Sequence, residues 1–290
     1  MEKLLQWAVN NSNQEELKRQ AEAIRRGELK ADQSKFDPAV IEAILGKDDA
    51  TRMKEAVDCI VDPNDTLENK EIALDNLEML VEHIDNAMNV DKMKLWPPIL
   101  EQLKSPEPAI RKGVAWVCGT AVQNNPNAQQ AFLANNGLEP LVTLLREEKD
   151  KEVKAKVIYA ISGLLKHCPE AVKAFKEKGG FEALQDIIKN TDDMAALRKV
   201  IFMYNSLMIE NDDLASELLK HHALDDLDTV LVKYTGQDED LTEKTLRTLA
   251  TLCSKTSQPL PAAVKPHVQE AKKVYTELGL DESEWNTLLA

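Results

Sequence analysis

Apolar residues recur along this chain at intervals of three and four, which is the spacing of one face of an α-helix. The stretch 75–89 (DNLEMLVEHIDNAMN) shows this spacing and predicts a single amphipathic helix. Its apolar stripe consists of Leu77, Leu80, Val81, Ile84 and Met88. Polar residues occupy the opposite side, namely Asp75, Glu78, Glu82, Asp85 and Asn89. These carboxylates should face solvent or a partner, because a catalytic pair needs a pocket that shifts its pKa values.

The apolar pattern also repeats at longer range. The segment 123–145 (QNNPNAQQAFLANNGLEPLVTLL) aligns with 166–188 (KHCPEAVKAFKEKGGFEALQDII) at an offset of 43 residues, with proline, alanine, phenylalanine and glycine at matching places. A looser copy covers 210–231, and an earlier copy begins at Trp96. Such a period is the sequence signature of stacked helical repeats.

Each repeat predicts a similar series of helices. A short helix should end at Gly137 or Gly180 in the left-handed conformation, an apolar helix should follow, and a long helix should stop before Pro169. Two or three helices in 43 residues are typical of armadillo and HEAT repeats. One unit cannot bury its apolar face alone, so we expect an all-α, right-handed curved solenoid of about four repeats.

The predicted solenoid leaves two flanking regions to assign. The repeats should run from roughly residue 53 to residue 255, and the segment after Pro259 should form a capping helix. Residues 1–35 do not fit the period and are rich in charged residues, so we expect a flexible N-terminal segment there. The domain organisation that follows is a flexible segment at 1–35 and a solenoid with capping helices at 36–290.

Composition and charge limit the possible partners. The chain is 43% hydrophobic but only 4% aromatic, which favours helices, and its net charge of −14 disfavours binding to nucleic acid or anionic membranes. No stretch approaches the length of a membrane span or of a secretory signal. Four widely spaced cysteines suggest buried free thiols in a reducing compartment, so we expect a cytoplasmic protein. The absence of a heptad seam favours a monomer.

Candidate catalytic and metal sites are weak. His221-His222 and His167-Cys168 are adjacent pairs whose side chains point to different faces of a helix, so they suit ordinary helix ends better than one metal ion. Gly179 and Gly180 do not belong to a phosphate-binding loop, and no nucleophile motif is found. We therefore expect neither an enzyme nor a bound cofactor.

A binding function is more consistent with the repeats. Armadillo solenoids usually bind through the third helices of their repeats, and those that hold basic peptides use tryptophan and asparagine one turn apart. In this chain the corresponding pairs are Trp116 with Thr120, Tyr159 with Gly163 and Phe202 with Ser206. The asparagine ladder is absent, which disfavours a basic extended peptide. The three aromatic residues are interpreted as core packing between repeats.

Four segments together resemble one known family. They are MEKLLQWA at 1–8, LDNLEMLVEHIDNAMN at 74–89, KLWPPIL at 94–100 and GTAVQNNPNAQQ at 119–130. They are similar to the cytosolic armadillo-type nucleotide-exchange factors of the 70-kDa heat-shock chaperone in their fungal branch, to which the vertebrate heat-shock-70-binding protein is related. The resemblance implies a protein that clasps one lobe of the chaperone ATPase domain, pushes the other lobe aside and releases ADP.

The resemblance also implies particular contact residues. Asp85, Asn86 and Ala87 would line the groove, and Arg198, at the start of the helix 198–207, would be a basic groove residue unless it is an ordinary solvated charge. Further groove candidates are Gln123, Asn124 and Asn125.

The N-terminal apolar island LLQWAV would have a second role by the same resemblance. Leu4, Leu5 and Trp7 would act as a pseudo-substrate that reaches the chaperone's substrate-binding domain and aids client release. The alternative for this island is a short helix docked on the solenoid. The alternative for the whole chain is a general armadillo scaffold with another partner. The fungal branch is also linked to translation, which these residues neither support nor deny.

Overall fold

The computed structural model describes residues 13–27, 46–275 and 277–290, and these residues form helices joined by short loops, with no strand among them. The chain divides into two compact units, Met1–Arg52 and Met53–Ala290. In the first unit, α2 (Gln14–Arg25) begins at Asn13, whose side chain accepts a hydrogen bond from the backbone N–H of Glu16 at 3.3 Å. The expected domain boundary at 35/36 lies outside the described residues and stays a prediction.

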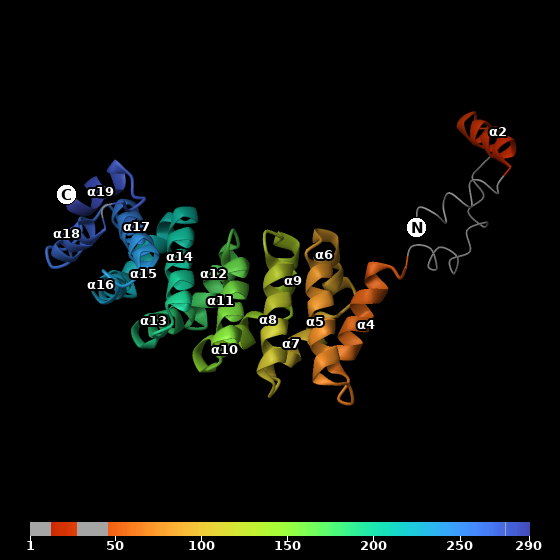
Figure 1. Cartoon of the computed structure of the whole chain (residues 1–290), viewed down its shortest axis with the longest axis horizontal. Helices are drawn as coiled ribbons and strands as arrows, with labels where there is room; N and C mark the ends of the chain where they lie inside the picture. The colour runs from red at the N-terminus through yellow and green to blue at the C-terminus, as the bar shows by residue number, and fades with distance from the viewer. Residues whose placement is uncertain (1–12, 28–45, 276) are drawn as a thin grey trace. The chain divides into compact units, whose positions relative to one another are not determined.

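The second unit contains the predicted solenoid (Figure 1). It begins with α4 (Asp49–Val61), which crosses the boundary between the units, and α5 (Leu67–Val81). Four three-helix repeats then extend from Ile84 to Thr256. Their helices are α6 (Ile84–Lys92), α7 (Trp96–Glu101), which η2 (Gln102–Lys104) continues, and α8 (Pro108–Val122); α9 (Pro126–Ala134), α10 (Leu138–Glu147) and α11 (Lys151–Leu165); α12 (Pro169–Glu177), α13 (Gly180–Asn190) and α14 (Met194–Glu210); α15 (Asp212–Lys220), α16 (Ala223–Tyr234) and α17 (Glu239–Thr256).

Two further helices, α18 (Lys265–Val274) and α19 (Glu282–Leu289), cover the C-terminal end of the stack. The prediction of an all-α solenoid of about four repeats is therefore confirmed. The first full repeat begins later than expected, at Ile84, because α4 and α5 precede it as a separate helix pair.

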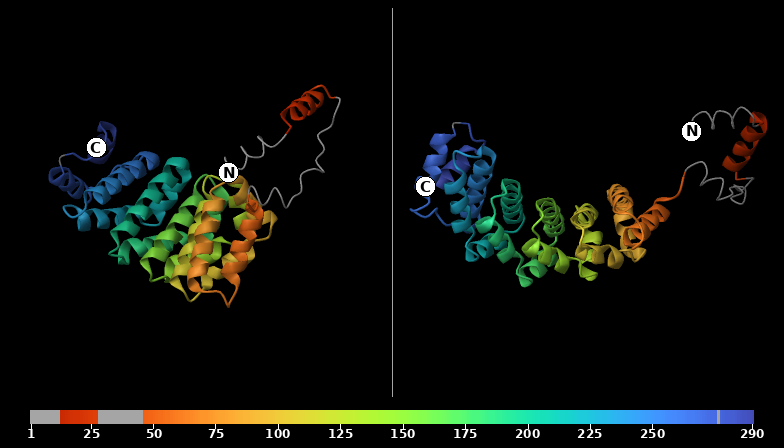
Figure 2. Two further views of the ribbon diagram at one scale, coloured as in Figure 1. Left: turned by 45° about the vertical axis from the view of Figure 1, so that its right-hand side comes forward. Right: turned by 60° about the horizontal axis from the view of Figure 1, so that its bottom comes forward.

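The long third helices form a continuous row. Each contacts its neighbour in the order α5, α8, α11, α14 and α17. Figure 2 shows that within Met53–Ala290 the stack bends into an arc, with the long helices from α5 to α14 on its inner side. The shorter helices lie behind this row. The open side of these long helices therefore faces the inner side of the arc.

The predicted single helix at 75–89 is wrong. The chain turns after Val81 and α6 begins at Ile84, with His83 in an extended conformation between the two helices. The amide of Asn86 donates a hydrogen bond to the carbonyl of Leu80 at 2.9 Å and so holds this turn together. Because the helix axis changes direction here, Ile84 becomes exposed although it was assigned to the apolar stripe.

The positions of the left-handed residues also differ from the prediction by one. Asn136 has φ 58° and Gly179 has φ 67°, whereas Gly137 lies in the right-handed region with φ −66°. Gly137 serves a different purpose, since a Cβ there would lie 2.4 Å from Cζ of Phe132. The glycine therefore makes room for the buried phenylalanine ring, and the residue before it turns the chain.

Candidate partner-binding face

The solvent-accessible side chains of α5, α8, α11 and α14 form one surface, which we call the inner face. Trp116, Tyr159 and Phe202 recur at intervals of 43 residues on α8, α11 and α14, and we call them the aromatic column. Trp116 and Tyr159 are half-buried, and Phe202 is 57% exposed. The interpretation of these aromatic residues as core is therefore wrong. The core between the repeats is built instead from other aromatic pairs, such as Trp96 with Phe132, whose ring centroids are 5.0 Å apart.

Polar contacts between neighbouring long helices order this face. The hydroxyl of Thr120 on α8 donates a hydrogen bond to Glu78 of α5 at 2.6 Å. The hydroxyl of Tyr159 on α11 donates to Oε1 of Gln123 at 3.1 Å. Glu78 was expected to point outward with the other carboxylates, but it is only 7% exposed. These contacts hold side chains of successive repeats in fixed positions before any partner arrives.

A lysine lies on the aromatic column. Nζ of Lys156 is 3.3 Å from the centroid of the Trp116 ring and 5.8 Å from that of Tyr159, so the ammonium makes a cation–π contact. Partial burial lowers the pKa of Lys156 from its usual value, and the charges of Lys199 and Lys112 lower it further, while Glu78 opposes this shift. A cation and aromatic rings are thus presented together near the middle of the inner face.

The segment Asp85, Asn86 and Ala87 lies on α6, outside the row of long helices. Asp85 is exposed, but Asn86 is 7% and Ala87 only 2% exposed. The side chains of Asn86 and Ala87 are thus buried in the free protein, and their contact with a partner stays a prediction. Asn86 supports the turn between α5 and α6, and Asp85 alone of the three is exposed.

The three candidates at the end of α8 also differ in their exposure to solvent. Gln123 and Asn124 are exposed, and Asn124 turns the chain with φ 51°. Asn125 is buried, and its side chain begins α9 by accepting a hydrogen bond from the N–H of Ala128 at 3.2 Å. Its amide also donates to the carbonyl of Ile84 at 3.3 Å, which ties two repeats together. Asn125 is thus a structural residue, and Gln123 and Asn124 remain candidates.

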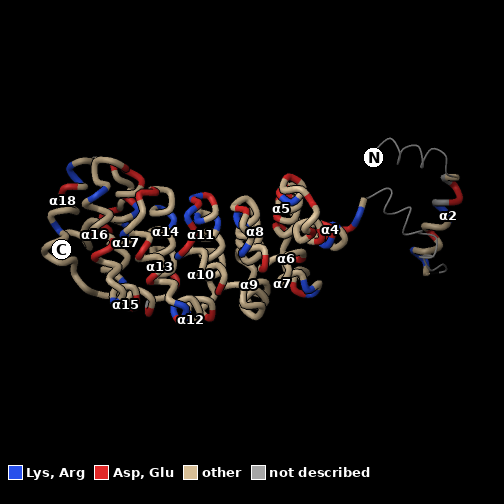
Figure 3. Tube along the Cα trace, turned by 90° about the horizontal axis from the view of Figure 1, so that it is seen from below, with Lys and Arg blue, Asp and Glu red and all other residues tan. Residues whose placement is uncertain are grey.

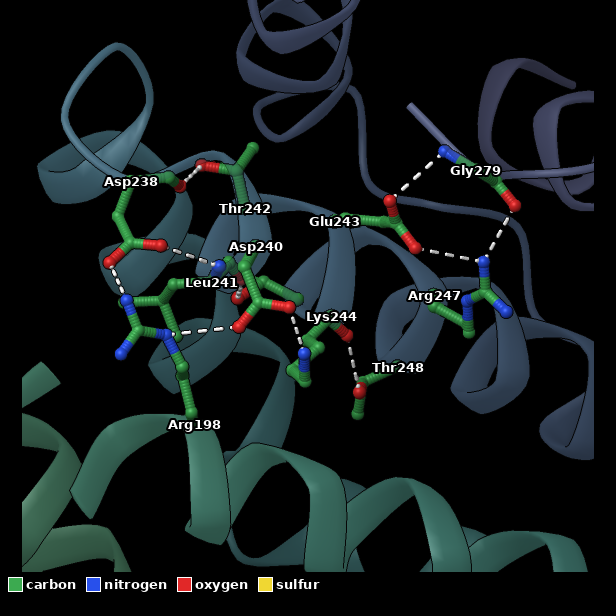
Figure 4. A network of polar contacts seen from close by, with 11 residues as sticks. Arg198, Asp238, Asp240, Leu241, Thr242, Glu243, Lys244, Arg247, Thr248 and Gly279 are labelled. Atoms are coloured by element: carbon green, nitrogen blue, oxygen red, sulfur yellow. Dashed lines mark hydrogen bonds and ion pairs between the residues drawn. The ribbon is translucent and has the colours of Figure 1, made fainter. Parts of the chain in front are cut away.

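Arg198 lies inside α14, which begins four residues earlier than expected, at Met194. Figure 4 shows its guanidinium between two carboxylates at the start of α17. It forms an ion pair with Asp238, and its Nε lies 3.0 Å from Oδ2 of Asp240. The alternative of an ordinary solvated charge is wrong, because the side chain links two repeats and is 34% exposed. A partner would meet Arg198 with its charge already compensated.

The other predicted sites add no residue to the inner face in the described part of the chain. Leu4, Leu5 and Trp7 lie outside the described residues. Within the described part of the chain, no cluster of three or more histidine, cysteine or acidic side chains could hold a metal ion. In that same part, no helix combines the length and the apolar character needed to cross a membrane.

Sequence reasoning missed Lys156 and Lys199 as surface residues of the inner face. A usable signal was present, since the two lysines are separated by the same 43 residues as the aligned repeats. Equivalent positions of a solenoid lie on the same face, so a charge repeated at the period marks a charged row.

Solved structures with the same architecture are armadillo repeat proteins. A designed armadillo repeat protein in complex with the peptide (KR)4 aligns with a TM-score of 0.63 at 16% identity, covering 82% of this chain and 97% of its own. An engineered protein aligns with a TM-score of 0.63 at 18% identity, over 82% of this chain and 94% of its own. At these sequence identities the structural similarity shows the fold alone, and this fold is that of the armadillo repeat proteins.

Two family models match the sequence. The model described as nucleotide exchange factor Fes1 matches residues 1–90, and the model of the SIL1/FES1/HPBP1 C-terminal domain matches residues 86–230. The chain belongs to the Fes1/SIL1/HPBP1 family. The resemblance of the four sequence segments to this family is therefore confirmed.

Fungal relatives agree with this assignment. Hsp70 nucleotide exchange factor fes1 of Schizosaccharomyces pombe is 51% identical over 135 residues, which is 47% of each chain. Hsp70 nucleotide exchange factor FES1 of Mycosarcoma maydis is 42% identical over 177 residues, covering 57% of this chain and 44% of the relative. The protein of the same name in Scheffersomyces stipitis is 42% identical over 170 residues, covering 58% of this chain and 56% of the relative. The chain spans about half the length of the curated relatives it matches.

Proposed function

We propose that this protein is a nucleotide-exchange factor that holds the ATPase domain of Hsp70 on its inner face and promotes ADP release. The observation that carries the proposal is membership of the Fes1/SIL1/HPBP1 family, whose fungal relatives are named as exchange factors for Hsp70. The inner face supports it, because aromatic, cationic and polar side chains are accessible to solvent there on a continuous row of helices. Such a surface suits a folded partner.

The proposed mechanism needs no catalytic group. A factor that binds the open form of a hinged ATPase domain more tightly than the closed form shifts the population toward the open form. ADP binds the open form less well, so it dissociates sooner. Linkage requires that ADP weakens binding of the factor by the same ratio. The protein would thus act by binding alone and would not be an enzyme.

The test is release of fluorescently labelled ADP from Hsp70 in a stopped-flow instrument, with and without this protein. We expect faster release with the wild-type protein. Phe202→Glu places a charge on the inner face and should remove most of the stimulation. Val232→Glu is the matched control, because Val232 on α16 is also 57% exposed but lies outside the row of long helices.

Two results would contradict the proposal. The first is an unchanged rate of ADP release with a folded wild-type protein, which would favour the alternative of an armadillo scaffold with another partner. The second is equal loss of stimulation in Phe202→Glu and Val232→Glu, which would place the contact elsewhere than on the inner face. Equal melting temperatures of the two variants are required, and both positions are exposed enough to allow this.

The N-terminal segment is part of the same proposal. Leu4, Leu5 and Trp7 would occupy the client site of the chaperone, so deletion of residues 1–35 should slow client release and spare ADP release. If both processes proceed unchanged, this role is wrong. We also propose a cytosolic location, which is consistent with the free thiols of Cys59, Cys118, Cys168 and Cys253.

A further inference from the structure

Basic residues outnumber acidic residues on two of the long helices of an acidic protein. The whole chain has a net charge of −14. Helix α8 nevertheless contains Arg111 and Lys112 and no acidic residue, and α11 contains three lysines and one glutamate. Helix α5, at the N-terminal end of the row, contains four acidic residues and one lysine. Figure 3 shows basic segments on α8 and α11.

We call Lys112, Lys156 and Lys199 the lysine cluster. They come from α8, α11 and α14, so the cluster spans three consecutive repeats. The Lys156 ammonium lies over the Trp116 ring, and the charges of Lys112 and Lys199 both act on it. Repulsion of this kind opposes folding, and it makes the lysine cluster a candidate functional site.

Only one member of the lysine cluster has a carboxylate partner. Nζ of Lys112 lies 3.0 Å from Glu152. In the described part of the chain, no carboxylate lies within 4.0 Å of Nζ of Lys156 or Lys199. Lys156 is moreover held in place and partly desolvated by the Trp116 ring. Glu78 and Asp75 of α5 attract this ammonium without forming an ion pair with it. A partly desolvated ammonium that has no carboxylate within ion-pair distance can receive one from outside.

We propose that the lysine cluster receives an acidic surface of the Hsp70 ATPase domain, with a carboxylate of that surface bound to Lys156. The inference rests on the proposed function and specifies the chemistry of the contact. Lys112 and Lys199 would attract the same surface from both sides, and Trp116, Tyr159 and Phe202 would contact its apolar parts. The acidic helix α5 repels such a surface, so the acidic part of the partner would lie over α8, α11 and α14 in one orientation only.

The test measures the affinity of the isolated Hsp70 ATPase domain for three variants by calorimetry. Lys156→Met keeps an unbranched side chain over Trp116 but removes the charge, and should weaken binding about tenfold. Lys156→Arg keeps the charge and the stacking and should bind within about twofold of wild type. Lys173→Met on α12 is the matched control, because it removes one charge from a lysine side chain that is 79% exposed, and it should bind like wild type.

A salt series gives an independent readout. Between low and high ionic strength, the affinity of the wild type should fall more steeply than that of Lys156→Met, because exposed charges are screened. The inference would be overturned if Lys156→Met bound the ATPase domain as tightly as the wild type, or if Lys156→Met and Lys156→Arg lost the same amount of affinity. Either result would leave the exchange function intact. A wild-type protein that does not bind the ATPase domain at all would instead overturn the proposed function.

Discussion

Replacement of Ala87 by arginine tests whether Ala87 supports the fold or contacts the partner. Ala87 is 2% exposed on α6, and α6 packs against α5, α8 and α9. A larger side chain at a tightly packed position costs about 1–3 kcal/mol, even when it is apolar. The guanidinium adds the cost of a buried charge without a partner, which is reduced if the long side chain reaches the surface. We therefore expect Ala87→Arg to lower the free energy of unfolding by about 3 kcal/mol.

This loss should be visible in a thermal melt. For a folded unit of this size, 1 kcal/mol corresponds to a change of roughly 2–4 °C in melting temperature, so we expect a decrease of about 6–12 °C. Asp85→Arg is the control, since Asp85 lies on the same helix but is exposed. Its melting temperature should remain within about 2 °C of wild type. Circular dichroism and ADP release measured on both variants distinguish unfolding from loss of contact.

A clear result would refute the reasoning. If Ala87→Arg melts like the wild type and yet fails to stimulate ADP release, the position must be accessible in solution, and the contact role implied by the family resemblance would stand. If Asp85→Arg alone loses stimulation with an unchanged melt, α6 takes part in binding through its exposed side.

Three further predictions concern stability and pH. Arg198→Ala should lower the free energy of unfolding by about 1.5–3 kcal/mol in urea titrations, because the charged hydrogen bond to Asp238 and the ion pair with Asp240 are lost; wild-type stability would refute this. Gly180→Ala should cost about 1–3 kcal/mol in a thermal melt, since a Cβ would lie 2.3 Å from Cε2 of Phe175. Burial raises the pKa of the Glu148 carboxyl, but Arg111 and two backbone N–H groups lower it, so the folded-state pKa lies below 4.5. The ionised carboxylate therefore stabilises the fold above the unfolded pKa, and this stabilisation is lost as pH falls through the folded pKa. Glu148→Gln should flatten this acid-side decline, and an unchanged pH profile would count against it.

The repeat architecture could be predicted because it depends on information that is periodic in the sequence. Prolines at the starts of α9 and α12 and buried phenylalanines in the same helices recur at one offset, and each marks the same place in its repeat. The left-handed residues were placed one position too late. Asn136 and Gly137 can both turn a chain, and only the position of the Phe132 ring decides between them.

The candidate site could be predicted only in part. The turn between α5 and α6 contains neither proline nor glycine, so periodicity alone could not reveal it. The side-chain bond from Asn86 to Leu80 and the packing of α6 are tertiary features, and they decide that Ala87 is buried and Asp85 exposed. The row of long helices was expected to carry the binding surface, but which of its aromatic residues face solvent depends on the direction in which each helix is rotated.

The inner face owes its order to contacts that each span only two repeats. Lys112 and Gln123 bind Glu152 and Tyr159 of α11, and Arg198 binds the start of α17, so α8 is linked to α11 and α14 to α17. In a solenoid, where a repeat contacts only its neighbours, such bonds maintain the spacing of the whole row. A partner that binds across several repeats then meets side chains whose positions are already set, and little ordering entropy is lost on binding. Under the proposed function, such a surface would stabilise the open form of a hinged domain relative to the closed form.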